Sequence, residues 1–97
     1  MTFADYLINC TDKENLVKVL HGLLDNAKGK NVAIVIMALE RKKLLHISDT
    51  RTVFYEAMRI LFGYIGTNQS INKFYSTGTT LDVEIEAKIQ KVMDILP

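Results

Sequence analysis

An unbroken run of eight apolar residues, Val32–Leu39, constrains the fold of this chain more than any other feature. A stretch without a polar position must be buried on all sides, so it must lie at the centre of the domain. Periodicity alone does not assign its structure, because a fully buried strand and a fully buried helix both read as continuous apolar sequence. The β-branched residues of the run favour a strand.

The residues that follow the run favour a helix instead. Glu40–Lys43 and the apolar pair Leu44–Leu45 continue the pattern at helical spacing, and no turn residue interrupts the stretch from Asn31 to His46. We therefore predict a central helix here, with a buried strand as the alternative. His46 would lie at the end of this helix and interact with its last carbonyls.

Amphipathic helices are expected before this stretch. Thr2 with Asp5, and Thr11 with Glu14, match the capping box, in which a hydroxyl and an acid satisfy the free amides of a helix start. The helix from Thr11 would end at Gly29, because glycine tolerates the left-handed conformation of a C-cap. Its apolar stripe would comprise Leu16, Leu20, Leu23, Leu24 and Ala27.

Three more helices are expected after it. Arg51–Phe62 follows the capping residues Ser48–Thr50 and is closed by Gly63. A short helix over residues 67–75 would turn Ile71, Phe74 and Tyr75 inward. A last helix would begin at Thr79 with Asp82, and its apolar stripe would comprise Ile85, Ile89, Val92, Met93 and Leu96. We predict an all-α fold, a compact bundle of five to six short helices in a single domain over residues 1–97, with a helix-turn-helix-like arrangement in residues 50–75.

Composition narrows the function. Twelve Lys and Arg residues nearly balance eleven Asp and Glu residues, so no strong field draws the chain to nucleic acid or an anionic membrane. The single cysteine, Cys10, cannot form an internal disulfide, which points to a reducing compartment. The first residues lack the pattern of a signal peptide, and the longest apolar run is far shorter than the roughly 20 residues that span a bilayer. We expect a cytoplasmic protein without membrane contact.

The residue types that usually carry chemistry are not grouped in the sequence. His21 and His46 have no Cys, His or carboxylate at metal-ligand spacing on the same face. A pairing of Cys10 with His21 is conceivable in three dimensions, but a lone cysteine is more often a small buried apolar residue. Gly63–Gly66 has the spacing of the backbone-clamping loop of KH domains, yet Tyr64 and Ile65 are better explained as plugs that hold a turn against the core. We expect no enzyme activity, metal or cofactor.

Two interpretations of the surface remain. A short polar helix after a glycine turn is typical of helix-turn-helix proteins, in which Gln69, Asn72 and Lys73 would contact DNA bases. The basic run Arg41, Lys42 and Lys43 would contact phosphates. A solvated polar helix face is the simpler explanation of the same residues.

The other interpretation is a contact with a protein. The stretch from Val53 to Tyr75 holds more apolar surface than one helix face can bury, and this surplus is typical of an interface. Its candidate residues are Tyr55, Ile60 and Tyr64, and a symmetric homodimer is the expected assembly. Burial of a central helix on several sides would explain the same pattern.

The stretch from Asn31 to Phe74, with the segments VAIVIMAL and IGTNQSINKFY, resembles small proteins encoded on mobile elements of gut anaerobes. It also resembles the C-terminal helical domain of the RteC-like regulators of conjugative transposons. The resemblance implies an all-helical fold and a role in regulating excision or transfer of an element. Two functions are therefore expected, a non-enzymatic helical interaction or regulatory module, or a helix-turn-helix transcriptional or excision regulator that binds DNA.

Overall fold

The computed structural model describes residues 2–48, 50–77 and 83–97, with the side chains of residues 74–77 outside the description. A short 3-10 helix, η1 (Phe3–Tyr6), precedes α1 (Lys13–Leu24), α2 (Lys30–Arg41), α3 (Arg51–Phe62), α4 (Asn68–Thr77) and α5 (Val83–Ile95). The described residues form no strand. The predicted all-α bundle of five to six helices is confirmed.

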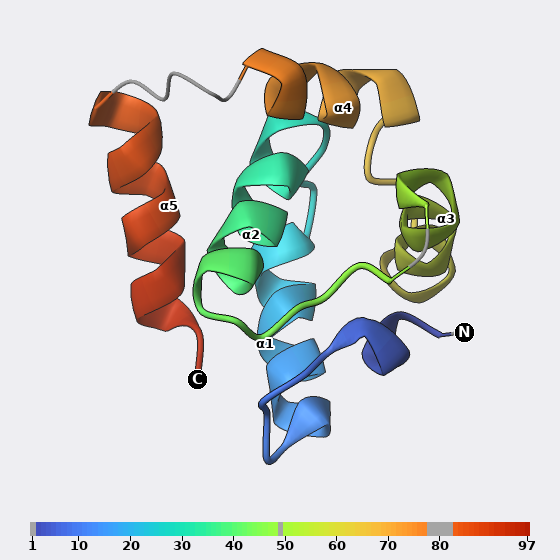
Figure 1. The fold of residues 1–97 in the computed structure, drawn as a ribbon, viewed down its shortest axis with the longest axis vertical. Coiled ribbons are helices and arrows are strands. Elements are labelled where there is room, and N and C mark those ends of the chain that lie inside the picture. Colours follow the sequence, from blue (N-terminus) through green and yellow to red (C-terminus); the bar gives the residue numbers. More distant parts are fainter. Residues whose placement is uncertain (1, 49, 78–82) are drawn as a thin grey trace.

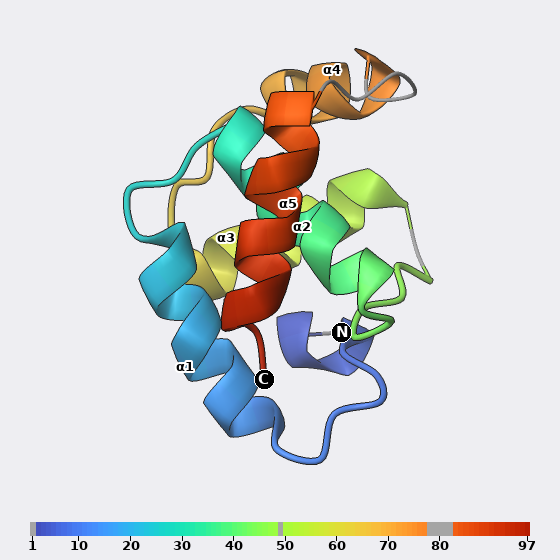
Figure 2. The ribbon, with the colours of Figure 1, turned by 90° about the vertical axis from the view of Figure 1, so that its left-hand side faces the viewer.

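The apolar run Val32–Leu39 lies within helix α2, so its prediction as a helix is confirmed. Helix α2 is at the centre of the bundle, as expected. Every residue of this run except Met37 is buried. In Figure 1, α5 lies on one side of α2, α3 lies on the other, and α4 crosses the end at which α2 begins. Figure 2 shows α5 packed along α2, with α1 beside them. The radius of gyration is 12.4 Å, close to the roughly 13 Å of a compact domain of this length.

Helix α2 ends at Arg41, so the prediction that it continues to His46 is wrong. Lys43 adopts a left-handed conformation with a φ of 58°. Its amide donates to the carbonyl of Glu40, and the amide of Leu44 donates to the carbonyl of Leu39, which is the Schellman arrangement of a helix end. Leu44, the apolar residue after the cap, is buried, as is Leu39. Glycine usually occupies this position at a helix end, but here the residue is Lys43. The end of α2 could therefore not be recognised from the sequence.

The residues after this cap pair with the N-terminal segment. Leu45 forms an isolated antiparallel bridge with Leu7. The amide of Ile8 donates to the carbonyl of Leu44 at 2.8 Å, and the amide of His46 donates to the carbonyl of Tyr6 at 2.9 Å. The predicted role of His46 at the end of the central helix is therefore wrong. This pairing holds η1 against the body of the protein.

Both ends of α1 differ from the prediction. Asp12, not Thr11, is the N-cap, and its side chain accepts a hydrogen bond of 3.0 Å from the amide of Asn15. The helix ends at Leu24, and Asn26 takes the left-handed conformation with a φ of 61°. Gly29 is instead the residue before α2, where its φ is 56°. The capping interaction at Thr2 is confirmed, since the carboxylate of Asp5 accepts from the Thr2 amide at 2.7 Å.

Helix α3 has the predicted bounds, with Thr50 as its N-cap and Gly63 as its C-cap. Phe54 is buried against aromatic rings of η1, with ring centroids 5.7 Å from Phe3 and 5.1 Å from Tyr6. Helix α4 confirms the predicted short helix, and Ile71 is buried as expected. The predicted inward positions of Phe74 and Tyr75 lie outside the described side chains.

Helix α5 packs on α2 with the predicted stripe. Ile89 and Leu96 are buried, and Ile85, Val92 and Met93 pack against the core as partly buried residues. The predicted cap formed by Thr79 and Asp82 lies outside the described residues.

Candidate interaction site

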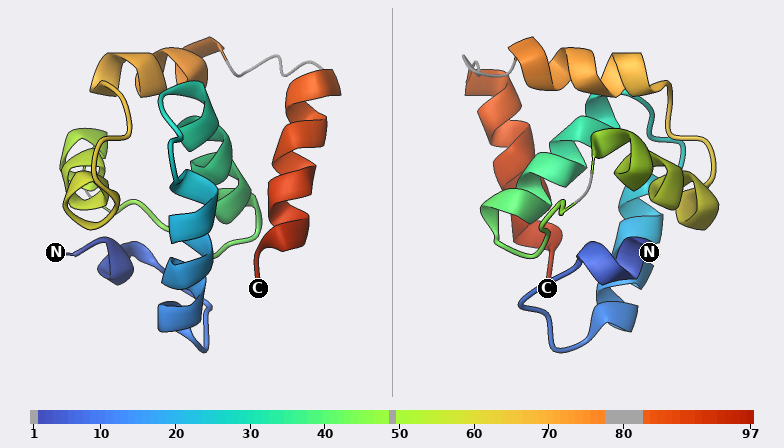
Figure 3. Two further views of the ribbon diagram at one scale, coloured as in Figure 1. Left: turned by 180° about the vertical axis from the view of Figure 1, so that it is seen from behind. Right: turned by 45° about the vertical axis from the view of Figure 1, so that its right-hand side comes forward.

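An apolar hollow lies between η1, the first half of α1 and the end of α3, and we call it the α1–α3 groove. Its volume is about 500 Å³, within the range of ligand and peptide pockets. Figure 3 shows the three elements that form it on one side of the bundle. The groove is lined by Thr2, Phe3, Ala4, Lys13, Glu14, Val17, Ala57, Ile60 and Leu61.

Aromatic packing fixes the walls of this groove. Phe3 is buried, and its ring lies 5.1 Å from the ring of Phe62 in an edge-to-face arrangement. Because Phe3 also contacts Phe54, η1 is tied to both ends of the inner face of α3. Such aromatic pairs stabilise a contact by about 0.5–1.5 kcal/mol beyond the area they bury. The groove is therefore a preformed surface.

Ile60 projects from the rim of the groove. Its exposed fraction is 88%, the highest among the large apolar residues that the structure describes. Ala57, one turn earlier on α3, is buried in the groove, and Leu61 beside it is partly covered. Exposure of so large an aliphatic side chain to water is unfavourable, so burial of Ile60 against another molecule would lower the free energy.

The polar groups of the rim carry opposite charges. Lys13 and Glu14 are the first residues of α1, and both are exposed. Thr2, on the other side, is also exposed, and its amide is bonded to Asp5. This hydrogen bond holds the pKa of the Asp5 carboxyl below its ordinary value. The groove is thus an apolar floor with a mixed polar rim, the composition of a typical protein interface.

The same face continues along α1 through two more hollows. Val17 and Glu14 line both the groove and the next hollow, which reaches His21. His21 also lines a third hollow of about 330 Å³, together with Phe62 and Tyr64. The three hollows follow α1, whose twelve residues extend over roughly 18 Å at 1.5 Å per residue. The face is long enough for a helix of similar length.

The far end of this face is aromatic and basic. The ring of His21 lies 4.7 Å from the ring of Phe62. The ammonium of Lys28 lies 5.3 Å from the centroid of the Tyr64 ring, a cation–π contact. Tyr64 remains 65% exposed, so the interpretation of this residue as a plug is wrong, whereas Ile65 is buried as expected.

The three residues predicted to contact a partner differ in their exposure to solvent. Ile60 and Tyr64 are exposed, and both lie on the face just described. Tyr55 is completely buried, and its hydroxyl donates to the side-chain oxygen of Asn72 at 2.7 Å. Its burial, which also raises the pKa of the phenol, makes the prediction of a partner contact at Tyr55 wrong. Phe3 and Val17 were missed, because Val17 lies beside the stripe of α1 and η1 is too short to show a period.

The candidate base-reading residues lie together on α4. Gln69 and Lys73 are exposed, whereas the side-chain oxygen of Asn72 is occupied by Tyr55. Helices α3 and α4 are joined by the five residues 63–67, one or two more than the usual helix-turn-helix connection. Arg59 crosses this turn and donates to the Gly66 carbonyl and to the Asn68 side chain.

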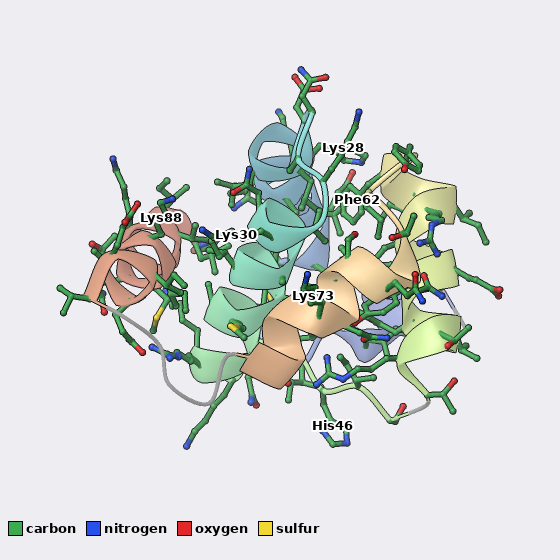
Figure 4. All side chains as sticks on the ribbon, turned by 90° about the horizontal axis from the view of Figure 1, so that it is seen from above. Lys28, Lys30, His46, Phe62, Lys73 and Lys88 are labelled. Atoms are coloured by element: carbon green, nitrogen blue, oxygen red, sulfur yellow. The ribbon has the colours of Figure 1, made fainter. Side chains whose placement is uncertain are left out.

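The basic run at the end of α2 is not placed beside α4. Arg41 forms a bidentate ion pair with Glu86 of α5, with N–O distances of 2.6 and 2.8 Å. Lys42 donates to three carbonyls at the end of α5, those of Met93, Leu96 and Pro97. Both cations therefore hold α5 in place. Figure 4 looks onto the opposite end of the molecule, where Lys73 of α4 lies, and Lys28 and Lys30 lie on the same side.

Comparison with protein-family models, curated proteins and solved structures found no match to this chain. The described residues contain no group of three His, Cys, Asp or Glu side chains placed to hold a metal ion. None of the helices in the described ranges has the length and apolarity needed to cross a membrane.

Proposed function

We propose that this protein is a non-enzymatic interaction module of the cytoplasm that binds the apolar face of a partner helix in the α1–α3 groove. The observation that carries the proposal is the exposed side chain of Ile60 at the rim of a preformed apolar hollow. Amphipathic helices bind such grooves through apolar anchors spaced three, four and seven residues apart. Regulation would follow from competition between partners for this one face.

A peptide selection tests this proposal. A display library of amphipathic twelve-residue helices is selected on the protein at submicromolar concentration, and each selected peptide is measured by fluorescence anisotropy. The proposal predicts peptides that lose at least about tenfold in affinity for Ile60→Asp, as expected for a central interface residue.

Val83→Asp is the matched control, because Val83 is 87% exposed but belongs to α5. Peptides should bind this variant as tightly as they bind the wild type. A selection that yields no peptides, or only peptides indifferent to Ile60→Asp, would refute the groove as a helix-binding site.

A second candidate function is DNA binding by α4 as a regulator of a mobile element. The observation in its favour is the exposure of Gln69 and Lys73, with Lys28 and Lys30 on the same side of the protein. The predicted phosphate contacts Arg41 and Lys42 are engaged with α5 instead. Fluorescence anisotropy with duplex DNA should then show binding that weakens steeply with salt and with Lys73→Ala. Failure to bind at low salt would remove this candidate.

A further inference from the structure

We infer that the helix bound in the α1–α3 groove is α3 of a second copy of this chain. The two copies would be related by a twofold axis, so that Ile60 of each copy enters the groove of the other. This inference rests on the proposed function, since it names the partner of the same site.

The projecting side chain and the hollow belong to one surface. Ile60 lies on the rim of the groove, and Ala57 and Leu61 of the same helix line it. A twofold interface uses the same patch on both copies, so each patch must supply both the projection and the hollow. The α1–α3 groove has both.

Helix α3 also has the anchor spacing that an apolar groove binds. Val53 and Ile60 are seven residues apart on its outer face and are 44% and 88% exposed. Leu61, at the next position, widens this apolar strip. The chain thus contains a helix that fits the class of ligand argued for its own groove.

The charges of the rim permit two copies to approach. Lys13 and Glu14 have opposite signs, and no ion pair of either residue is found in the part of the chain that the structure describes. The whole chain has a formal net charge of only +1. A face of a single sign would repel its copy, whereas this face can place each charge near its opposite in the partner.

The surface area that a stable dimer must bury shows how far the interface between the two copies must extend. A stable interface buries about 800 Å² of each partner, roughly one seventh of the 5771 Å² accessible surface of this chain. The groove alone is too small for this. The interface should therefore continue along α1 to Tyr64, whose side chain is exposed at the far end of the same face.

Analytical ultracentrifugation over micromolar concentrations tests this inference. The wild type is expected to form a dimer whose dissociation constant rises at least about tenfold in Ile60→Asp, because an aspartate would be buried without a partner. Val83→Asp should dimerise like the wild type. Circular dichroism of both variants checks that the fold is kept, which is expected since both side chains are exposed.

The outcomes separate this inference from the proposed function. A wild type that stays monomeric at several hundred micromolar would overturn the inference, while peptides selected on the groove would leave the proposed function intact. A dimer that Ile60→Asp does not weaken would also overturn the inference, since the contact would then lie elsewhere.

Discussion

Gly66 and Gly29 lie where two turns of the chain touch. The amide of Gly29 donates to the carbonyl of Ile65 at 3.0 Å, and a Cβ on Gly66 would lie 2.7 Å from the Gly29 nitrogen. Gly66 also has a φ of 97°, which other residues rarely adopt. Glycine is therefore required at Gly66 for both its conformation and the space around it.

Gly66→Ala should lower the free energy of unfolding by about 2–4 kcal/mol, because left-handed strain and overpacking act together. Gly22→Ala is the matched control, since Gly22 lies within α1 and a Cβ there would meet nothing within 4 Å. This control should gain about 0.5–1 kcal/mol from the better helix propensity of alanine. Urea unfolding of the three proteins measures both changes. Equal stabilities of wild type and Gly66→Ala would contradict the close contact.

Single residues also explain why the ends of α1 and α2 were predicted wrongly. A lysine in the left-handed cap position, Lys43, concealed the end of α2, so Leu44 and Leu45 read as one more helical turn. Asn26 did the same for α1, and Gly29 was assigned to the wrong helix. Asn26 and Lys43 both adopt a left-handed conformation that glycine takes more readily, so the residue types at these positions did not mark the helix ends.

At the scale of elements, α5 is held to α2 by cations as well as by its apolar stripe. The carboxylate of Glu86 accepts hydrogen bonds from Arg41, and this contact holds the pKa of Glu86 below its ordinary value of 4.5. A lowered pKa means that the contact stabilises the fold above about pH 4.5 and is lost as the pH falls through the folded-state pKa. The contact should therefore be absent in acid.

Glu86→Gln should lower the melting temperature at pH 7 by a few degrees at most, since both side chains are partly exposed. The difference from the wild type should narrow as the pH falls below 4.5, and it should close once the pH lies below the lowered folded-state pKa of Glu86, where the wild-type carboxylate is also protonated. Glu84→Gln is the control, because the ion pair of Glu84, at 3.6 Å, is with Lys88 of its own helix. Thermal unfolding between pH 3 and pH 7 checks this, and a difference that persists in acid would contradict it.

Lys42 acts on the end of α5 in a different way. Its ammonium donates to the carbonyls of Met93 and Leu96 at 3.3 and 3.2 Å, which stabilises the unpaired end of the helix. Lys42→Met keeps the apolar stem and removes these bonds, at a cost of about 1 kcal/mol.

Hydrogen exchange should show faster exchange in the last turn of α5 in Lys42→Met, including the amide of Leu96 that donates to Val92. Lys43→Met, at the neighbouring exposed lysine, should leave that exchange unchanged. Equal exchange in the two variants would argue against a capping role of Lys42.

At the scale of the whole molecule, the sequence predicted the helical fold and the central position of Val32–Leu39 well. Burial on all sides follows directly from an apolar run, and amphipathic stripes show which faces must pack. The groove could not be predicted, because it arises where η1 and α1 meet α3, which is distant from both in sequence. Surplus apolar surface pointed to Ile60 and Tyr64 correctly as exposed residues, but it could not show that Tyr55 is buried by α4.

Intermolecular paramagnetic relaxation tests most directly whether the face along α1 and α3 is the contact between two copies. A nitroxide is attached at Lys13→Cys in a Cys10→Ser background, and this protein is mixed with a ¹⁵N-labelled wild-type copy. We predict broadening of the amides of Val17, Ala57, Ile60 and Leu61 in the labelled copy, with those of Lys88 and Gln90 on α5 unaffected. Broadening confined to α5 or α4, or none at millimolar concentration, would contradict the assignment of this face.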